Sequence, residues 1–231
     1  MHEGPAPKKG LQQLKRFQIF CDFDGTLAEK DVGQQFFLTF SDPKVSEEAV
    51  TAWLNGEISS AEMYRRELAV TRATRDQIHQ FTMSQRLSEG AVELIRRCQQ
   101  AGDEVFVVSD GFAAYIRTIL DKFGLQALPL FANDLTLDAT GQLRPVFPYL
   151  EHSCGRCANC KGYHVRRLRK EGLLQVYIGD GFSDRCAVTQ VEIVFAKRDL
   201  AKFCDEKGIA YYAFQNFKDI QSILEKIRRS E

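Results

Sequence analysis

Short apolar runs that end abruptly in polar residues recur along this chain. The run FQIFC at 17–21 is followed by DFDGT, and EVFVV at 104–108 is followed by SDG. Two further runs, at 174–178 and 192–195, end in GDG and in AK. Such runs are typical of strands buried on both faces of a parallel sheet. The pattern therefore predicts strands whose carboxyl ends carry polar groups.

Segments with helical spacing of apolar residues separate these strands, and a glycine that can end a helix follows each segment. The segments are 88–100, 113–123, 161–171 and 199–207. Their alternation with strands predicts an α/β fold with a Rossmann-like, mostly parallel sheet and helices on both faces. Because ligands of such sheets bind at the carboxyl ends of the strands, we expect the polar residues there to share one crevice.

Residues 31–85 interrupt the alternation with helical patterns alone. Capping-box patterns that begin at Ser59 and Thr74 predict a small helical insert after the first strand. Residues 133–148 predict a β-hairpin, with Pro145 in an edge strand. The expected organisation is a flexible basic tail at 1–16, a core of 17–30 and 86–231, and a helical cap at 31–85.

Composition and charge exclude several classes of function. The 31 basic and 31 acidic residues of this 231-residue chain cancel, so no strong global field draws it to nucleic acid or anionic lipid. No apolar run approaches the roughly 18 residues of a membrane span. Seven cysteines, three of them within 154–160, do not resemble a secreted disulfide framework. Since no apolar segment of 7 to 15 residues follows the basic residues of 1–16, we do not expect this segment to be a secretory signal. We expect a soluble, cytoplasmic monomer or homodimer.

Two carboxylates follow directly on the first predicted strand. Asp22 and Asp24 are two residues apart on an extended backbone, so both project to one side and can share a metal ion. Gly25 permits a sharp turn, and Thr26 offers a hydroxyl and a backbone N–H toward a bound anion. Two acids at the end of a buried strand are costly to place there without a function.

Four segments, in order, resemble the motifs of the haloacid-dehalogenase superfamily of phosphotransferases. They are DFDGT at 22–26, Ser109 after an apolar strand, Lys161 at the head of a helix, and GDGFSD at 179–184. The resemblance spans 17–184 and implies that Asp22 attacks phosphorus and becomes an aspartyl phosphate. It implies that Asp24 protonates the leaving group and then activates water, which favours a phosphatase or a phosphomutase over ion pumps and dehalogenases.

The same resemblance implies a magnesium ion and a phosphate site. Mg²⁺ would contact Asp22, the Asp24 carbonyl and Asp180, with help from Asp184. Ser109, Lys161 and backbone N–H groups near Gly111 would hold the phosphate oxygens. An insert between the first two motifs forms a substrate-selecting cap in this superfamily. Asp31, where the chain enters the insert, stands at the offset where phosphoserine phosphatases place a substrate-binding acid, and a helix N-cap is the alternative role.

Around Lys161 the chain resembles one branch of that superfamily more closely. The segment HSCGRCANCK at 152–161, the later IGD and FAKRDL resemble the methionine-salvage phosphatases that act on 2-hydroxy-3-keto-5-methylthiopentenyl 1-phosphate. Glu151 stands where that branch has proline, and SDG replaces SGG. Phosphoethanolamine and phosphocholine phosphatases also carry a cysteine segment that ends in CK.

The cysteine segment also offers ligands for a second metal. His152, Cys154, Cys157 and Cys160 supply enough nitrogen and sulfur for tetrahedral zinc, and the three thiols suit part of an iron–sulfur cluster. Buried small residues or a redox-sensitive pair are the alternatives. The other cysteines are predicted to lie in the core and His164 at the surface; these cysteines are Cys21, Cys98, Cys186 and Cys204.

The sequence thus predicts a Mg²⁺-dependent phosphomonoester hydrolase that acts on a small phosphorylated metabolite. The methylthiopentenyl phosphate is the first candidate substrate; phosphoserine and the phosphate esters of ethanolamine and choline are the alternatives. A catalytically retired binding module of the same fold is a hypothesis of another class. The intact Asp22, Asp24, Lys161 and Asp180 favour the enzyme.

Overall fold

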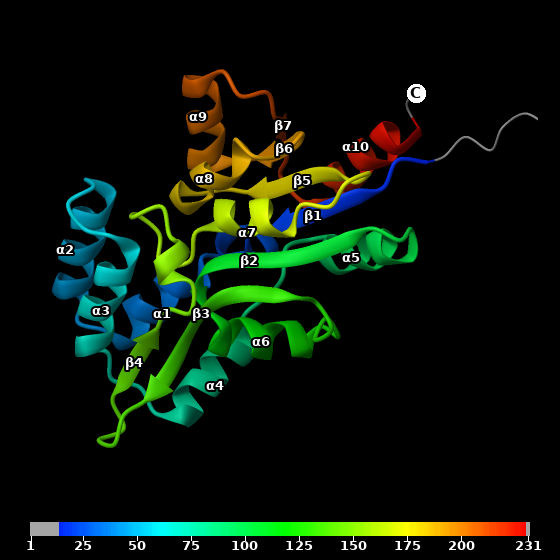
Figure 1. Ribbon diagram of the computed structural model, residues 1–231. Coiled ribbons are helices and arrows are strands. Elements are labelled where there is room, and N and C mark those ends of the chain that lie inside the picture. Colours follow the sequence, from blue (N-terminus) through cyan, green and yellow to red (C-terminus); the bar gives the residue numbers. More distant parts are fainter. Residues whose placement is uncertain (1–13, 230–231) are drawn as a thin grey trace, which may run out of the picture.

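A computed structural model describes residues 14–229, and within them the strands form one seven-stranded sheet (Figure 1). The strand order is β4-β3-β2-β1-β5-β6-β7, with every neighbouring pair parallel except β3 and β4. The strands are β1(Phe17–Cys21), β2(Glu104–Phe112), β3(Leu130–Leu137), β4(Leu143–Val146), β5(Leu174–Gly179), β6(Ile193–Ala196) and β7(Tyr212–Ala213).

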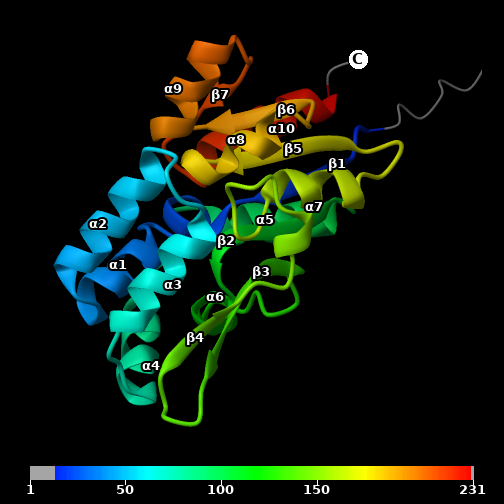
Figure 2. The same ribbon diagram turned by 60° about the vertical axis from the view of Figure 1, so that its left-hand side comes forward.

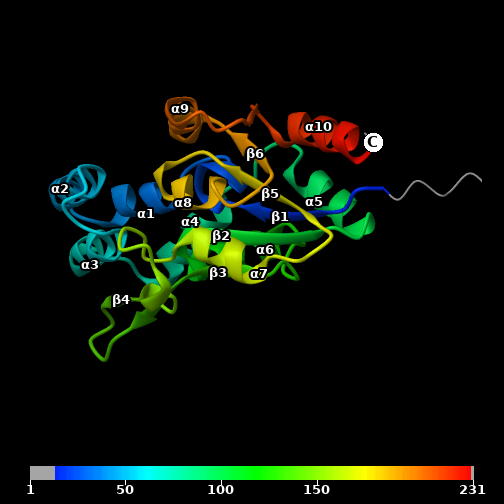
Figure 3. The ribbon, with the colours of Figure 1, turned by 45° about the horizontal axis from the view of Figure 1, so that its top comes forward.

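Helices cover both faces of the sheet, as Figure 3 shows from above. Alternate residues of β1 point to opposite faces: Phe17 and Ile19 pack with α5, α6 and α10, whereas Phe20 packs with α7, α8 and α9. The helices of these layers are α5(Ala91–Gln100), α6(Ala113–Lys122), α7(Lys161–Leu168), α8(Arg185–Val188), α9(Arg198–Lys207) and α10(Phe217–Arg229). Because β1 is buried on both faces, its carboxyl end is held rigidly at the centre of the sheet.

The insert after β1 consists of helices, as predicted. They are α1(Val32–Phe40), α2(Pro43–Leu54), α3(Ser60–Val70) and α4(Arg75–Ser84). Ser59 and Thr74 are N-caps, and Thr74 and Gln77 form a complete capping box. In Figure 2, α1, α2 and α3 stand beside the sheet, whereas α4 packs on α6. The division into a core and a cap stays a prediction, and most of the expected tail, 1–13, lies outside the described residues.

The predicted α/β fold is confirmed, and most element boundaries agree within a few residues. The hairpin is β3 and β4, with Pro145 in the edge strand. Sequence reasoning missed that β3 begins at Leu130 and joins β2 in parallel, and it missed β7 and α10. Helix α7 ends at Leu168, earlier than expected. Within 14–229 no helix is long and apolar enough to cross a membrane.

Candidate active site

The first motif forms a tight turn at the carboxyl end of β1. The Asp22 backbone N–H donates to the Ile178 carbonyl, which extends the β1–β5 ladder by one residue. The chain then turns through η1(Phe23–Leu27), where Gly25 has φ +71. A Cβ on Gly25 would lie 2.6 Å from Asp180 Oδ2, so the left-handed turn and the close approach both require glycine here. The turn brings Asp22 and Asp24 to the end of the sheet, as the sequence predicted.

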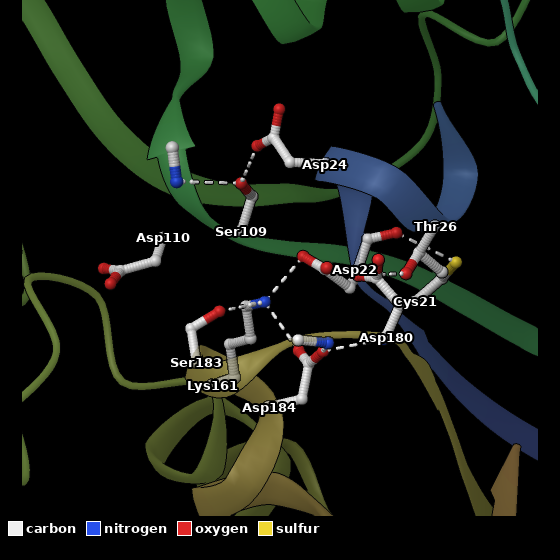
Figure 4. Close-up of polar contacts among 12 residues, drawn as sticks. Cys21, Asp22, Asp24, Thr26, Ser109, Asp110, Lys161, Asp180, Ser183 and Asp184 are labelled. Carbon is white, nitrogen blue, oxygen red and sulfur yellow. Dashed lines mark hydrogen bonds and ion pairs between the residues drawn. The ribbon is translucent and has the colours of Figure 1, made fainter. Parts of the chain in front are cut away.

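Lys161 connects the first, third and fourth motifs. Its Nζ donates to Asp22 Oδ1 at 2.6 Å, to Asp184 Oδ1 at 2.6 Å and to Ser183 Oγ at 2.8 Å (Figure 4). The side chain is only 1% exposed. Burial opposes its charge, yet the carboxylates of Asp184 and Asp22 raise the pKa of Lys161 above its usual value. The lysine is therefore a fixed cation at the site.

Asp184 is fully buried and organises the fourth motif. Its Oδ1 accepts from Lys161 and from the Tyr177 hydroxyl at 2.6 Å. Its Oδ2 accepts from the backbone N–H groups of Asp180 and Gly181 at 2.9 and 2.8 Å. With every acceptor direction in use, Asp184 positions Lys161 and the loop that carries Asp180.

Asp24 lies on the other side of the turn from this ion pair. Its carboxylate accepts from Gly33 N at 3.0 Å, from the Tyr115 hydroxyl at 3.1 Å and from Ser109 Oγ at 3.2 Å. Burial, with the Asp31 carboxylate adding to it, raises the pKa of Asp24 to about 7, although the hydrogen bonds from Gly33 and Tyr115 oppose the shift. Asp24 therefore exchanges a proton near neutral pH, as a group that acts both as acid and as base must.

Thr26 has a different place from the one expected. The side chain is completely buried, and its hydroxyl donates to Asp180 Oδ1 at 3.0 Å instead of facing an anion. The other oxygen of Asp180 accepts from Arg198 Nη1 at 2.9 Å. Arg198 has φ +49, an uncommon conformation for a residue with a Cβ, which indicates that its position is enforced by the surroundings. Sequence reasoning missed Arg198, although it follows directly on the polar end of β6.

Asp110, the middle residue of the SDG segment at 109–111, connects three parts of the chain. Its Oδ2 accepts from Ser60 Oγ at 2.6 Å, and its Oδ1 accepts from Asn159 N at 2.6 Å. Ser60 begins α3 in the insert, and Asn159 lies just before Lys161. Burial raises the pKa of Asp110 to about 6. Nothing in the sequence marked Asp110 as a contact between the insert and the sheet.

These side chains line one cavity of 680 Å³ between the sheet and the insert. From the sheet come Asp22, Asp24, Ser109, Gly111, Lys161 and Asp180. The insert contributes a mostly apolar wall with Glu67 and Asp31 among its polar members. The apolar residues are Phe37, Leu38, Pro43, Val50, Trp53, Leu54 and Met63. Asp31 both lines the cavity and caps α1 by accepting from Gln34 N at 2.8 Å, so both roles weighed for it are compatible.

Three acids of the site converge on one point. Carboxylate oxygens of Asp22, Asp180 and Asp184 lie within 4.8 Å of one another. Burial raises the pKa of Asp22 well above its usual value; Asp184 adds to that rise, and Lys161 only partly offsets it. Buried carboxylate oxygens whose negative charge is not fully compensated are suitable ligands for a hard divalent cation.

The cysteine segment requires a correction. The sulfurs of Cys154, Cys157 and Cys160 gather as predicted, but their fourth neighbour is Cys186 and not His152. The His152 ring instead stacks on Tyr163 at 4.6 Å. Cys186 was expected in the core because spacing within one segment does not show which distant residue joins it.

Two other predictions for single side chains can be compared with the structure. His164 was expected at the surface, but it is buried, and its Nε2 lies 2.5 Å from Asn159 Oδ1. The remaining cysteines, Cys21, Cys98 and Cys204, are buried as predicted.

Residues 17–203 match the family described as "Putative Phosphatase". The chain belongs to this family. This membership confirms the expected enzyme class, a phosphatase. Relatives named 2-hydroxy-3-keto-5-methylthiopentenyl-1-phosphate phosphatase are similar over nearly their full length. The protein of Brevibacillus brevis is 24% identical over 93% of this chain and 98% of its own, and that of Geobacillus thermodenitrificans is 27% identical over 92% and 97%.

Solved structures confirm the fold of this family member. A phosphoserine phosphatase described as a phospho-aspartyl intermediate analogue superposes with a TM-score of 0.69 at 22% identity, covering 92% of this chain and 99% of its own. A substrate-bound phosphoserine phosphatase complex gives a TM-score of 0.68 at 20% identity, covering 90% and 98%. Both have the haloacid-dehalogenase fold predicted from the motifs.

Proposed function

We propose that the protein is a Mg²⁺-dependent phosphomonoester hydrolase that acts through an aspartyl phosphate on Asp22. The observation that carries this proposal is the contact of Lys161 with both Asp22 and Asp184, beside Asp24 and Ser109, in one cavity. In this arrangement a carboxylate nucleophile, a cation for phosphate oxygens and a titrating acid face the same space. A retired binding module would not need all three.

Asp22 is proposed as the nucleophile. One carboxylate oxygen is held by Lys161, which fixes the orientation of the side chain, and the turn at Gly25 keeps it at the mouth of the sheet. Attack on phosphorus forms an oxygen–phosphorus bond to Asp22 while the ester oxygen leaves with its electron pair. Lys161 and Ser109 would then stabilise charge on the phosphoryl oxygens.

Asp24 is proposed as the acid and base. In its neutral form it gives a proton to the leaving oxygen; as a carboxylate it then takes a proton from the water that hydrolyses the aspartyl phosphate. A pKa of about 7 allows both forms to be populated near neutral pH. Tyr115, Ser109 and Gly33 N hold the carboxyl group in place for both steps.

The carboxylates of Asp22 and Asp180 and the Asp24 carbonyl are proposed to hold Mg²⁺. The excess of buried carboxylates over buried cations at this point fits a divalent ion. When bound, Mg²⁺ neutralises charge on the phosphate and on the nucleophile, so that the two can approach. Thr26 and Asp184 act on this site by fixing Asp180.

The wall contributed by the insert supports a substrate with an apolar end, and we propose 2-hydroxy-3-keto-5-methylthiopentenyl 1-phosphate. Its methylthio chain suits the apolar residues of α1 and α2. Glu67 is buried, and burial raises its pKa to about 8, so at neutral pH it is a hydrogen-bond donor for a keto or hydroxyl oxygen. Among the described residues that line the cavity, the only lysine and arginine are Lys161 and Arg198, so the carboxylate of phosphoserine has no cation on the insert side.

A phosphate ester of an amino alcohol is the second candidate. Asp31, Glu47 and Glu67 line the cavity and would favour a cationic end, provided that Glu67 becomes ionised. A cytoplasmic location and a monomeric or homodimeric state also remain predictions.

Phosphate release from a substrate panel tests the proposal. The panel contains the methylthiopentenyl phosphate generated in situ, phosphoethanolamine, phosphocholine and phosphoserine, each with and without Mg²⁺, and Asp22→Asn is the control. We expect Mg²⁺-dependent release that is fastest with the methylthiopentenyl compound. Preference for phosphoethanolamine would instead support the second candidate. No release from any compound would contradict the enzymatic proposal.

A further inference from the structure

Four cysteine sulfurs form a cluster outside the catalytic cavity. The Sγ atoms of Cys154, Cys157, Cys160 and Cys186 all lie within 4.8 Å of one another, and none of these residues lines the described cavity. Cys154 Sγ is 3.6 Å from Cys157 Sγ and 3.5 Å from Cys186 Sγ. All four are free cysteines.

The spacing of the sulfurs suits one tetrahedral ion. With metal–sulfur distances of about 2.3 Å, tetrahedral zinc separates its thiolate ligands by about 3.8 Å. The separations of Cys154 Sγ from Cys157 Sγ and from Cys186 Sγ are close to that value and far longer than the roughly 2.0 Å of a disulfide. A cluster of several iron ions would spread its cysteine ligands more widely, since bridging sulfides lie between them. Four sulfur ligands in tetrahedral arrangement favour zinc over the harder divalent cations.

The backbone turns sharply within the segment that carries three of these cysteines. Gly155 has φ +84, a left-handed conformation that lets the chain curl between Cys154 and Cys157. Tyr163 N donates to the Cys160 carbonyl at 3.1 Å, so the first turn of α7 holds Cys160 beside the cluster.

The cluster joins the third motif to the fourth. Cys160 immediately precedes Lys161 and is the N-cap of α7, whereas Cys186 lies in α8, two residues after Asp184. The two helices pack so closely that a Cβ on Gly162 would collide with the Cys186 carbonyl oxygen. An ion shared by these cysteines would therefore stabilise the geometry of the buried Lys161–Asp184 pair.

The same loop also contacts the insert. Arg156 donates through Nη2 to the Trp53 carbonyl at 2.6 Å and through Nη1 to the Ile58 carbonyl at 3.2 Å. Ser60 Oγ accepts from Ala158 N at 2.6 Å, and Ser60 N donates to the Arg156 carbonyl at 2.9 Å. In Figures 1 and 2 this loop lies between α7 and the helices α2 and α3.

We propose that Cys154, Cys157, Cys160 and Cys186 bind one structural zinc ion that fixes the loop carrying Lys161 against α8 and the insert. The sequence spacing alone suggested His152 as the fourth ligand; the geometry assigns that place to Cys186. The proposed zinc site is separate from the proposed Mg²⁺ site, and zinc binding does not depend on catalysis. Its zinc content can therefore be measured whether or not the phosphatase proposal holds.

Elemental analysis of the purified protein, after dialysis against metal-free buffer, tests the proposal. We expect about one zinc per chain, released by a thiol-blocking mercurial, and a tetrahedral thiolate spectrum when Co²⁺ replaces zinc. The catalytically blocked Asp22→Asn protein should carry the same zinc. Protein that contains no zinc and takes up neither Zn²⁺ nor Co²⁺, or that contains iron instead, would overturn the assignment.

Variants distinguish the ligand sets. Cys186→Ser should lose most of the zinc, whereas His152→Ala and the matched buried-cysteine control Cys98→Ala should retain it. Hydrogen exchange of the 153–160 amides should become faster in Cys186→Ser, with the exchange of β1 unchanged. If Cys186→Ser does not fold, the His152→Ala protein still distinguishes the two ligand sets. Loss of its zinc and of its Co²⁺ spectrum would refute the set of four cysteines.

Discussion

Replacing Asp24 by asparagine should abolish turnover and also stabilise the fold at neutral and alkaline pH. The Asp24 carboxyl is held where ionisation is unfavourable, and its pKa rises from 3.8 to about 7. The folded state therefore binds this proton more tightly than the unfolded chain does. Ionisation opposes folding, and the opposition grows as the pH rises from 3.8 to 7. Asparagine has no charge to bury and can still accept from Gly33 N through its carbonyl oxygen.

The magnitude follows from the shift. About three pKa units at 1.36 kcal/mol each give at most about 4 kcal/mol in the free energy of unfolding. The difference between Asp24→Asn and wild type should be small near pH 4. It should increase by about 1.4 kcal/mol per pH unit and become constant above pH 7.

Urea unfolding at a series of pH values, in buffer free of divalent cations, measures this difference. Asp121→Asn, which alters an exposed carboxyl on α6, is the matched control. A difference between Asp24→Asn and wild type that stays constant from pH 4.5 to 8 would refute the reasoning, because the Asp24 pKa would then be the same in both states.

Four further predictions concern neighbouring residues. Asp22→Asn should fold but release no phosphate and retain no label after acid quench with a labelled ester, whereas near wild-type turnover would exclude it as the nucleophile. Lys161→Ala should reduce kcat/KM about 10²–10³-fold. It should also lower the free energy of unfolding by about 3–5 kcal/mol because two buried carboxylates lose their cation, and unchanged urea unfolding would contradict this. Gly111→Ala should nearly abolish turnover because its Cβ would collide with the Tyr115 hydroxyl and with Asp24 Oδ2. Adding Tyr115→Phe removes the closer contact and should restore part of kcat; no restoration would contradict the assignment of the loss to the Tyr115 collision. Glu67→Leu should raise KM about tenfold, whereas Glu67→Gln, which keeps a hydrogen-bond donor, should leave KM within about twofold of wild type. Equal effects of the two substitutions on KM would argue against a hydrogen bond from Glu67 to the substrate.

Much of the candidate site at the carboxyl end of the sheet could be predicted from sequence because it depends on local patterns. An apolar strand followed by DFDGT places Asp22 and Asp24 at the end of the sheet, although their carboxylates lie on different sides of the turn. The parallel sheet brings Ser109, Lys161 and Asp180 to the same edge. The strand and helix alternation fixes this edge without knowledge of any individual contact. The α/β fold and the meeting of these residues were therefore both predictable.

Only the tertiary structure decided contacts between residues far apart in the chain. Thr26 binds Asp180 rather than facing the cavity, Asp110 joins the insert to the loop before Lys161, and Cys186 completes the sulfur cluster. No periodicity or spacing within one segment specifies such partners. They result from how helices settle on the sheet, where a close approach such as that of α7 and α8 depends on the packing of every neighbouring side chain.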